Sequence, residues 1–268
     1  MGRKSENVLS NSSFITCRGS VNDLSFELHM ADIFSLGSEG LINPANNRLD
    51  HVGGLAANIS SLAGKEFAKA CGYHLRDKKL LSPGEILVTD SFELKKRGIK
   101  KIINVVGEVI DSYRASPKQE RSLKDTIQNS ILKAEENNLN SLSMPAVSCG
   151  IFRFPLDQAA RCHVEGFISA SEILKRRGNA GASMKVVRFA FIQELEATEF
   201  SNCFLESFEK FSFFAYHGLP KNRVCHKFKY CGGCSGFFKK KTFQSSSLLH
   251  ELLQLLCVQV SVNVLHYM

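Results

Sequence analysis

The chain has 268 residues, 44% hydrophobic and 22% charged, which is ordinary for a globular protein and allows one large domain with a modest extension. No stretch offers the roughly 18–20 uninterrupted apolar residues of a membrane span, and the N-terminus lacks the apolar core of a secretory signal, so we expect neither. The net charge of +8 favours anionic partners such as phosphates or nucleic acid, and nine cysteines without a signal predict free thiols.

The first half of the chain predicts four strands and one helix. Residues 1–20 are polar and without pattern, so we expect a disordered terminus. Leu24–Met30 alternates apolar and polar residues, which predicts a strand with one buried face. The other elements expected here are a short strand from Leu41, a helix over 55–71, and strands over 85–90 and 100–106.

The second half continues the alternation. The apolar spacing predicts a helix over 122–138, and the run 141–147 predicts a strand. Pro155 is placed to open a helix, and a strand over 185–192 and a helix over 197–211 follow. This order predicts an α/β fold, a three-layer α/β/α domain with a mixed, mostly parallel central sheet. We therefore expect a domain over 21–212 and a basic, Cys-containing C-terminal extension over 213–268.

Two loops after predicted strands are candidates for an anion site. Sheets of this kind bind ligands at the carboxyl ends of their strands. In the first loop, Ile42–Ile59, the chain turns into a helix at Gly53 and Gly54, so backbone N–H groups can approach an anion there. A simple helix-capping turn is the alternative for these glycines. Asn43, Asn46 and Asn47 precede them; they are common turn residues and also suit ribose hydroxyls.

The second candidate loop is 146–157, where Ser148-Cys149-Gly150-Ile151-Phe152 joins a strand to a helix. Alone it could be an ordinary turn. Two such loops in one α/β domain allow a diphosphate to lie between two backbones, so the sequence predicts a site for a diphosphate-bearing ligand.

Six segments, in this order, resemble the macrodomain family of ADP-ribose-binding modules over most of 22–212. The segment around His51 is most like macrodomains carried by some poly(ADP-ribose) polymerases. The six are Ala31-Asp32-Ile33, Asn43-Pro44-Ala45-Asn46, His51-Val52-Gly53-Gly54-Leu55-Ala56, Ser82-Pro83-Gly84-Glu85, Ile102-Ile103-Asn104-Val105-Val106-Gly107 and Pro145-Ala146-Val147-Ser148-Cys149-Gly150-Ile151-Phe152.

The resemblance implies a role for each matched position. Asp32 would accept a hydrogen bond from the adenine amino group, with Ile33 beside it and Ile192 flanking the base. Asn46 would hold the distal ribose, near Phe152. The residues lining the diphosphate would be Gly53, Gly54 and Leu55 on one side, and Ser148, Cys149, Gly150, Ile151 and Phe152 on the other. The structural alternatives are a turn role for Asp32 and plain core roles for Phe152 and Ile192.

Some members of this family hydrolyse ADP-ribose from proteins, so catalysis is a second hypothesis. One hydrolytic group has an Asp where this chain has Ala56, which counts against that mechanism. His51 matches a histidine that other members carry, so Asn46 and His51 are the candidate catalytic residues, acting through a water. Val52, Pro44 and Asn104 also depart from the family pattern without removing the pocket.

The resemblance does not cover the extension. Residues 201–268 carry eight Lys/Arg and three Glu, so +5 of the net charge lies there. Cys225, His226, Cys231 and Cys234 are too closely spaced for a typical zinc finger, so we predict no metal site, and we expect no cofactor. Leu248–Leu265 is apolar but interrupted by polar residues, so a membrane partner is not expected.

Three functions remain open at this point. The first is a reader that binds ADP-ribose and ADP-ribosylated proteins in the cytoplasm or nucleus. The second is an ADP-ribosyl-protein hydrolase that uses the same pocket. The third is a domain without ligand affinity that acts through its basic extension on nucleic acid or protein, with RNA or poly(ADP-ribose) as the partner of that extension.

Overall fold

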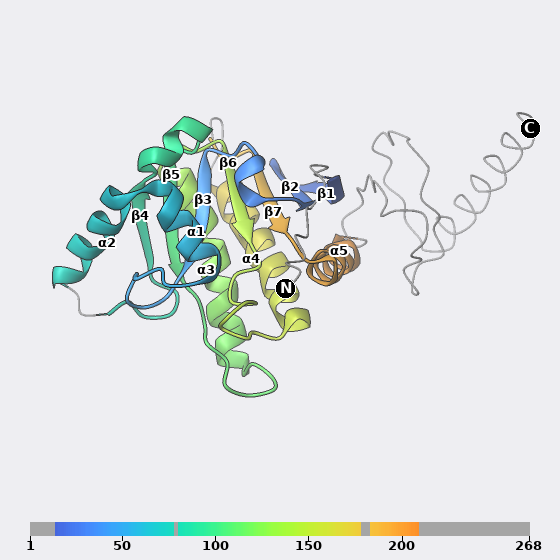
Figure 1. Cartoon of the computed structure of the whole chain (residues 1–268). Coiled ribbons are helices and arrows are strands. Elements are labelled where there is room, and N and C mark those ends of the chain that lie inside the picture. Colours follow the sequence, from blue (N-terminus) through green and yellow to red (C-terminus); the bar gives the residue numbers. More distant parts are fainter. Residues whose placement is uncertain (1–13, 78–79, 178–182, 209–268) are drawn as a thin grey trace, which may run out of the picture. The chain divides into compact units, whose positions relative to one another are not determined.

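Strands and helices alternate along the chain in the computed structural model, which describes residues 14–77, 80–177 and 183–208 (Figure 1). The strands are β1 (Phe14–Val21), β2 (Leu24–Met30), β3 (Gly40–Ala45), β4 (Ile86–Asp90), β5 (Lys101–Val106), β6 (Ser141–Pro145) and β7 (Val186–Phe191). The helices are α1 (Gly54–Ala63), α2 (Lys65–Asp77), α3 (Pro117–Glu136), α4 (Leu156–Arg176) and α5 (Glu194–Phe208), with 3₁₀ turns η1 (Ile33–Ser35) and η2 (Phe92–Arg97).

The seven strands form one sheet in the order β1-β2-β7-β6-β3-β5-β4. The neighbouring pairs from β2 to β5 are parallel, and each edge strand, β1 and β4, pairs antiparallel with its neighbour. The predicted three-layer fold with a mixed, mostly parallel sheet is therefore confirmed. The boundary at 212 and the extension stay predictions, because residues 209–268 lie outside the described part.

Two apolar cores fill the space between the sheet and its helices. Leu41 and Ala45 of β3 join the core under α1 and α2, whereas Ile42 joins the core under α3, α4 and α5. This alternation along one strand is what a sheet covered on both faces requires. The larger core contains a group of phenylalanine rings, in which Phe204 lies 4.8 Å from Phe26 and 5.1 Å from Phe189 between ring centroids.

The helix predicted over 55–71 is two helices. Gly64 has φ 87°, a conformation that glycine adopts readily, and its N–H donates to the Ser60 carbonyl, so α1 ends there and α2 starts at Lys65. The prediction of one continuous helix was wrong, because it gave a single glycine too little weight.

The expectation of a disordered segment over 1–20 is also corrected, since β1 begins at Phe14. Its register against β2 shifts between Ile15 and Cys17, so two consecutive side chains, Thr16 and Cys17, are buried. A bulge of this kind interrupts the alternation of apolar and polar residues by which a strand is detected from sequence. Residues 1–13 are not described.

No helix within the described ranges is long and apolar enough to span a bilayer. The five cysteines described, Cys17, Cys71, Cys149, Cys162 and Cys203, are free thiols, as predicted. The four candidate zinc ligands between Cys225 and Cys234 fall outside the described ranges.

Candidate functional site

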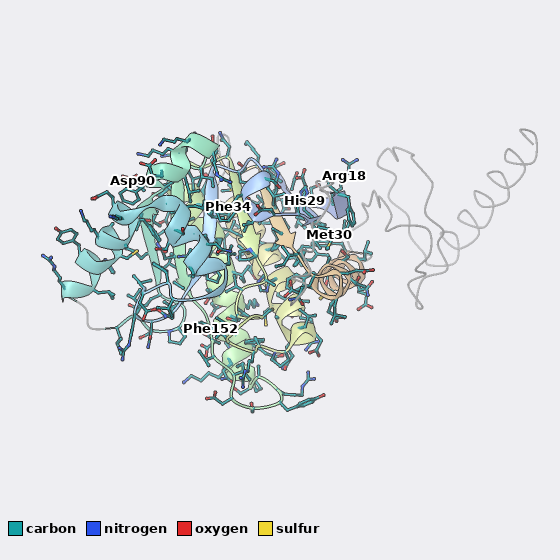
Figure 2. The ribbon with its side chains drawn as sticks, viewed as in Figure 1. Arg18, His29, Met30, Phe34, Asp90 and Phe152 are labelled. Atoms are coloured by element: carbon teal, nitrogen blue, oxygen red, sulfur yellow. The ribbon has the colours of Figure 1, made fainter. Side chains whose placement is uncertain are left out.

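The carboxyl ends of five parallel strands meet at one edge of the sheet. In sheet order, β2 leads into Ala31, β7 into Ile192, β6 into the second loop, β3 into the first loop and β5 into Gly107. Figure 2 shows Phe152 of the second loop at the opposite end of the sheet from Asp90, which pairs with the first residue of β5. The predicted site residues therefore lie along the edge at which such sheets bind ligands.

The first loop opens directly into helix α1. Gly53 is the N-cap residue of α1, and no side chain of the described residues caps this end of the helix. Gly54 has φ 58°, where a side chain would be strained. Uncapped N–H groups and the positive end of the helix dipole make this terminus suited to an anion. Leu55 is half-buried behind it and Ala56 is buried.

The second loop faces the first. A Cβ placed on Gly53 would lie 3.4 Å from Cδ1 of Ile151, and one on Gly54 would lie 3.8 Å from the same atom. Ile151 itself is 73% exposed and Gly150 is exposed, so this contact is at the surface. The two predicted anion-binding loops are thus brought together, as a diphosphate site requires.

The second loop turns on Ser148, which has φ 69° and is buried. The carbonyl of Ser148 accepts a hydrogen bond from the N–H of Phe154 at 3.0 Å, and the Gly150 carbonyl accepts from Arg153 at 3.0 Å. Cys149 is half-buried and burial raises the pKa of its thiol, so it stays protonated at neutral pH. These bonds fix the loop without using the N–H groups of Gly150 and Ile151.

Gly107 is a further site residue, which was not among those predicted from sequence. A Cβ on Gly107 would lie 2.2 Å from Oγ of Ser148, so a larger residue at this position would require Ser148 to move. The next turn is tied to the same loop, because Ile110 donates its N–H to the carbonyl of Phe152 at 2.9 Å. A glycine directly after a buried strand was the available signal.

Asp32 and Ile192 lie at the other end of the edge, after neighbouring strands. The Ala31 N–H donates to the Phe191 carbonyl at 3.0 Å and so joins the two strand ends. Oδ1 of Asp32 accepts from the Phe34 N–H at 3.1 Å, and within the described residues Oδ2 has no partner. Asp32 is exposed and Ile192 is 66% exposed, so Ile192 is not a core residue; Ile33 is buried.

Asn46 is held by its own loop. Its Oδ1 accepts from the backbone N–H groups of Arg48 at 3.1 Å and Asp50 at 3.4 Å, while Nδ2 donates to the Asp50 carboxylate. An amide has two N–H groups, so one is left to donate outward. Asn46 is half-buried and stands between β3 and the glycines.

His51 does not face the open edge. Its side chain lies in the core under α1 and α2 and is 6% exposed, with its ring stacked on Phe67 at 5.0 Å. Nδ1 lies 3.3 Å from Nδ2 of Asn43, and Nε2 lies 3.5 Å from Sγ of Cys71. Burial lowers the pKa of the imidazole, so His51 is neutral at neutral pH. Asn43 is also fully buried and is not available to a ribose.

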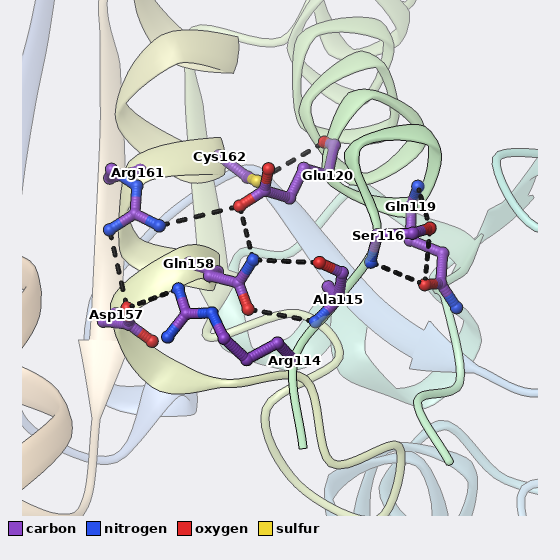
Figure 3. A network of polar contacts seen from close by, with 9 residues as sticks. All are labelled: Arg114, Ala115, Ser116, Gln119, Glu120, Asp157, Gln158, Arg161 and Cys162. Carbon is purple, nitrogen blue, oxygen red and sulfur yellow. Dashed lines mark hydrogen bonds and ion pairs between the residues drawn. The ribbon is translucent and has the colours of Figure 1, made fainter. Parts of the chain in front are cut away.

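A polar network beside the second loop fixes the first turn of α4 (Figure 3). Gln158 is buried and makes two hydrogen bonds to the backbone of Ala115, at 3.0 and 3.1 Å, and a third to Glu120. Arg114 and Arg161 both contact the carboxylate of Asp157. The exposed ion pairs contribute little, whereas the buried Gln158 joins α4 to the segment that follows Gly107.

Two hollows of about 360 and 400 Å³ lie elsewhere, one between the turn at Pro83 and α3 and one between the β1–β2 turn and α4. Neither is lined by a residue of the two loops. A diphosphate is bound by exposed backbone N–H groups and does not need a deep cavity, so the two loops remain the candidate site.

Comparison with known proteins matches residues 42–163 to the Macro domain family. An ADP-ribose glycohydrolase of Archaeoglobus fulgidus is 30% identical over 161 residues, which cover 58% of this chain and 81% of that protein. A macro domain-containing protein of Xanthomonas axonopodis pv. citri is 36% identical over 141 residues, covering 52% and 75%.

The chain belongs to the macrodomain family. An Oceanobacillus iheyensis macrodomain with ADP has the same fold, with a TM-score of 0.62 at 24% identity over 74% of this chain and 98% of that one. A Trypanosoma brucei macrodomain in complex with ADP-ribose gives a TM-score of 0.55 at 22% identity, covering 66% and 68%. The Archaeoglobus protein is archaeal and the Xanthomonas protein is bacterial, so these two relatives do not support the narrower likeness to polymerase macrodomains.

Proposed function

We propose that this macrodomain binds ADP-ribose, free or attached to proteins, along the edge formed by the two loops. The observation that carries the proposal is the uncapped N-terminus of α1 at Gly53, directly opposite the second loop at Ile151. The solved relatives named with ADP and with ADP-ribose support it. The finer likeness to polymerase macrodomains stays a prediction based on the segment around His51.

The roles follow from the position of each residue. The diphosphate lies between Gly53-Gly54-Leu55 and Ser148–Phe152, where backbone N–H groups of both loops are exposed to it. Asp32 takes the adenine amino group on its free Oδ2, with Ile192 against the base. Asn46 offers its remaining N–H to the distal ribose.

Calorimetric titration of the full chain with ADP-ribose tests this proposal. We expect micromolar-range binding that is weakened at least about tenfold in Asp32→Ala, which corresponds to the loss of one charged hydrogen bond. Asp23→Ala is the matched control, since Asp23 is an exposed turn aspartate at the opposite edge of the sheet. Absence of heat with the folded wild-type protein would overturn the function, and equal losses in both variants would remove the adenine role of Asp32.

Hydrolysis of ADP-ribosylated proteins is the second candidate, and the named glycohydrolase relative favours it. As predicted from sequence it would use Asn46 and His51. The buried position of His51, with both ring nitrogens directed at Asn43 and Cys71, leaves Asn46 as the residue able to touch substrate. Turnover of a mono-ADP-ribosylated protein that is lost in Asn46→Ala even at saturating substrate would establish this activity.

The third hypothesis placed function in the basic extension. Residues 213–268 lie outside the described part of the chain, so the structure does not test this hypothesis. Affinity for RNA that falls steeply with salt and vanishes when 213–268 is deleted would support it.

A further inference from the structure

A buried chain of polar groups runs from strand β4 to the first loop. Nδ2 of Asn104 donates to the carbonyl of Leu87 at 3.0 Å, and this backbone acceptor fixes which way the amide of Asn104 points. Oδ1 of Asn104 then accepts from Nδ2 of Asn43 at 2.8 Å. Asn43 and Asn104 are paired residues of neighbouring strands and both are 0% exposed.

The same amide group of Asn43 determines the state of His51. Nδ2 carries only hydrogens to offer, so Nδ1 of His51, 3.3 Å away, must be the acceptor. The ring proton is then on Nε2, which faces the sulfur of Cys71 at 3.5 Å. The Leu87 carbonyl therefore fixes the orientation of the Asn104 amide, and Asn104 fixes that of Asn43. Asn43 in turn selects the neutral form of His51 with its proton on Nε2.

His51 is also a place where the backbone is constrained. It has φ 49°, a left-handed conformation that is uncommon for residues other than glycine, although histidine adopts it more readily than most. It stands two residues before Gly53, the N-cap of α1. The buried ring is stacked on Phe67 of α2, so the segment just before Gly53 is attached to the core.

We propose that Asn104, Asn43 and His51 form a positioning relay, which holds the first loop in its ligand-binding shape and does so only while His51 is neutral. The inference rests on the proposed binding of ADP-ribose. It differs from the sequence-based assignment, because His51 acts through the loop and touches neither substrate nor water.

A pH dependence follows from the geometry. A proton on Nδ1 would point at the N–H of Asn43, so two donors would face each other and the link would break. The ionisable groups around the ring are the Asp50 carboxylate, which favours the charged form, and the Cys71 thiol at Nε2; burial outweighs Asp50 and lowers the pKa of His51. Binding is therefore constant at neutral pH and weakens as the pH falls through the pKa of folded His51, which lies below the ordinary histidine value.

Two substitutions separate the ring nitrogens. His51→Asn places an amide oxygen close to the position of Nδ1 and cannot titrate, whereas His51→Gln places its polar atoms close to Nε2. We expect wild-type binding to weaken towards the acid end of a series from pH 7.5 to 4.5, and His51→Asn to bind within about threefold of neutral wild type with a flat profile over the same series. His51→Gln should bind at least about tenfold more weakly. Equal affinity of both variants, or a wild-type profile in His51→Asn, would overturn the relay.

A remote variant tests the relay as a chain. Asn104→Leu lies in the core away from the ligand and should weaken binding, yet it should add nothing further in a His51→Leu background, because the link is already broken. Additive losses in the double variant would mean that Asn104 and His51 act independently, and the relay would be wrong.

The tautomer of His51 can be measured in the wild-type protein without a ligand, even if the variants fail to fold. Nitrogen-15 NMR of wild-type imidazoles should show His51 neutral with its proton on Nε2 at pH 7.5. A proton on Nδ1 would overturn the relay. Failure of wild type to bind ADP-ribose, with the Nε2 tautomer in place, would instead refute the proposed function and the positioning role together, while leaving the hydrogen-bonded chain intact.

Discussion

The backbone N–H of Val147 donates a hydrogen bond to Nε2 of His163 at 3.1 Å. The other ring nitrogen, Nδ1, lies 2.7 Å from the carbonyl of Ala159 and must donate to it, so His163 is neutral. The ring is 0% exposed, and Val147 stands at the start of the second loop. Each of the two loops is thus attached to the core through a buried neutral histidine, His51 for the first loop and His163 for the second.

The domain should lose stability in mild acid because of His163. Burial lowers its pKa to about 4 from an ordinary value of 6.5, so the unfolded chain takes up a proton at a pH where the folded one does not. Its contribution to the free energy of unfolding is complete above pH 6.5 and is lost as the pH falls towards 4, on the order of 3 kcal/mol in all. Urea unfolding at several pH values from 7.5 to 4.5 measures this.

The control is His163→Gln, which retains a polar side chain but cannot titrate. Carboxylates contribute to acid sensitivity in both proteins, so the informative quantity is the difference between the two slopes. A slope as steep in the variant as in wild type would show that His163 is not responsible.

Much of the site could be predicted because it depends on local sequence and on one topological rule. Glycines at 53 and 54 before a helix, and Ser148 to Phe152 after a strand, are local signals. Parallel strands bring such loops to the same edge whatever the strand order. The direction of His51 could not be found this way, because it depends on Asn43 pairing with Asn104, 61 residues along the chain, and on Phe67 and Cys71 from another helix.

Gly107→Ala should damage the second loop. The new Cβ would lie 2.2 Å from Oγ of Ser148, so the serine or the strand end must move. We expect the free energy of unfolding to fall by about 1–3 kcal/mol and ADP-ribose binding to weaken. Gly72→Ala is the matched control: Gly72 is exposed within α2, a Cβ there meets nothing within 4 Å, and helix propensity predicts a gain of up to about 1 kcal/mol.

Ser148→Ala should rescue Gly107→Ala. Once Oγ is gone, the nearest atoms to the new Cβ are Cβ of residue 148 and Cδ2 of Phe152, both at 3.5 Å, an ordinary contact distance. Oγ of Ser148 is buried and has no hydrogen-bond partner among the residues that the structure describes, so its removal alone should be neutral or slightly stabilising. Chemical denaturation of the double variant decides the matter, since a loss as large as that of Gly107→Ala would rule out the clash as the cause.

Helix α5 should be part of the domain core, and Phe204 tests this. Its ring is 0% exposed and meets Phe26 of β2 and Phe189 of β7. Phe204→Ala should cost about 3–5 kcal/mol in thermal or urea unfolding. Leu195→Ala in the same helix, at a side chain that is 70% exposed, should change stability by no more than about 0.5 kcal/mol. Similar small effects at both positions would mean that α5 is not packed on the sheet.

Strand β1 is the element that the sequence pattern missed, and Cys17 is the position that reports on it. Cys17 is 1% exposed in the larger core, and Thr16 beside it shares a hydrogen bond with Ser201 of α5 at 3.0 Å. Cys17→Asp would bury a carboxyl group among apolar side chains, so we expect a loss of about 3 kcal/mol or more, increasing with pH as the unfolded chain ionises. Ser20→Asp introduces the same group at an exposed position of the same strand and should be nearly neutral. If the segment were disordered, as its sequence suggested, the two variants would unfold at the same denaturant concentration.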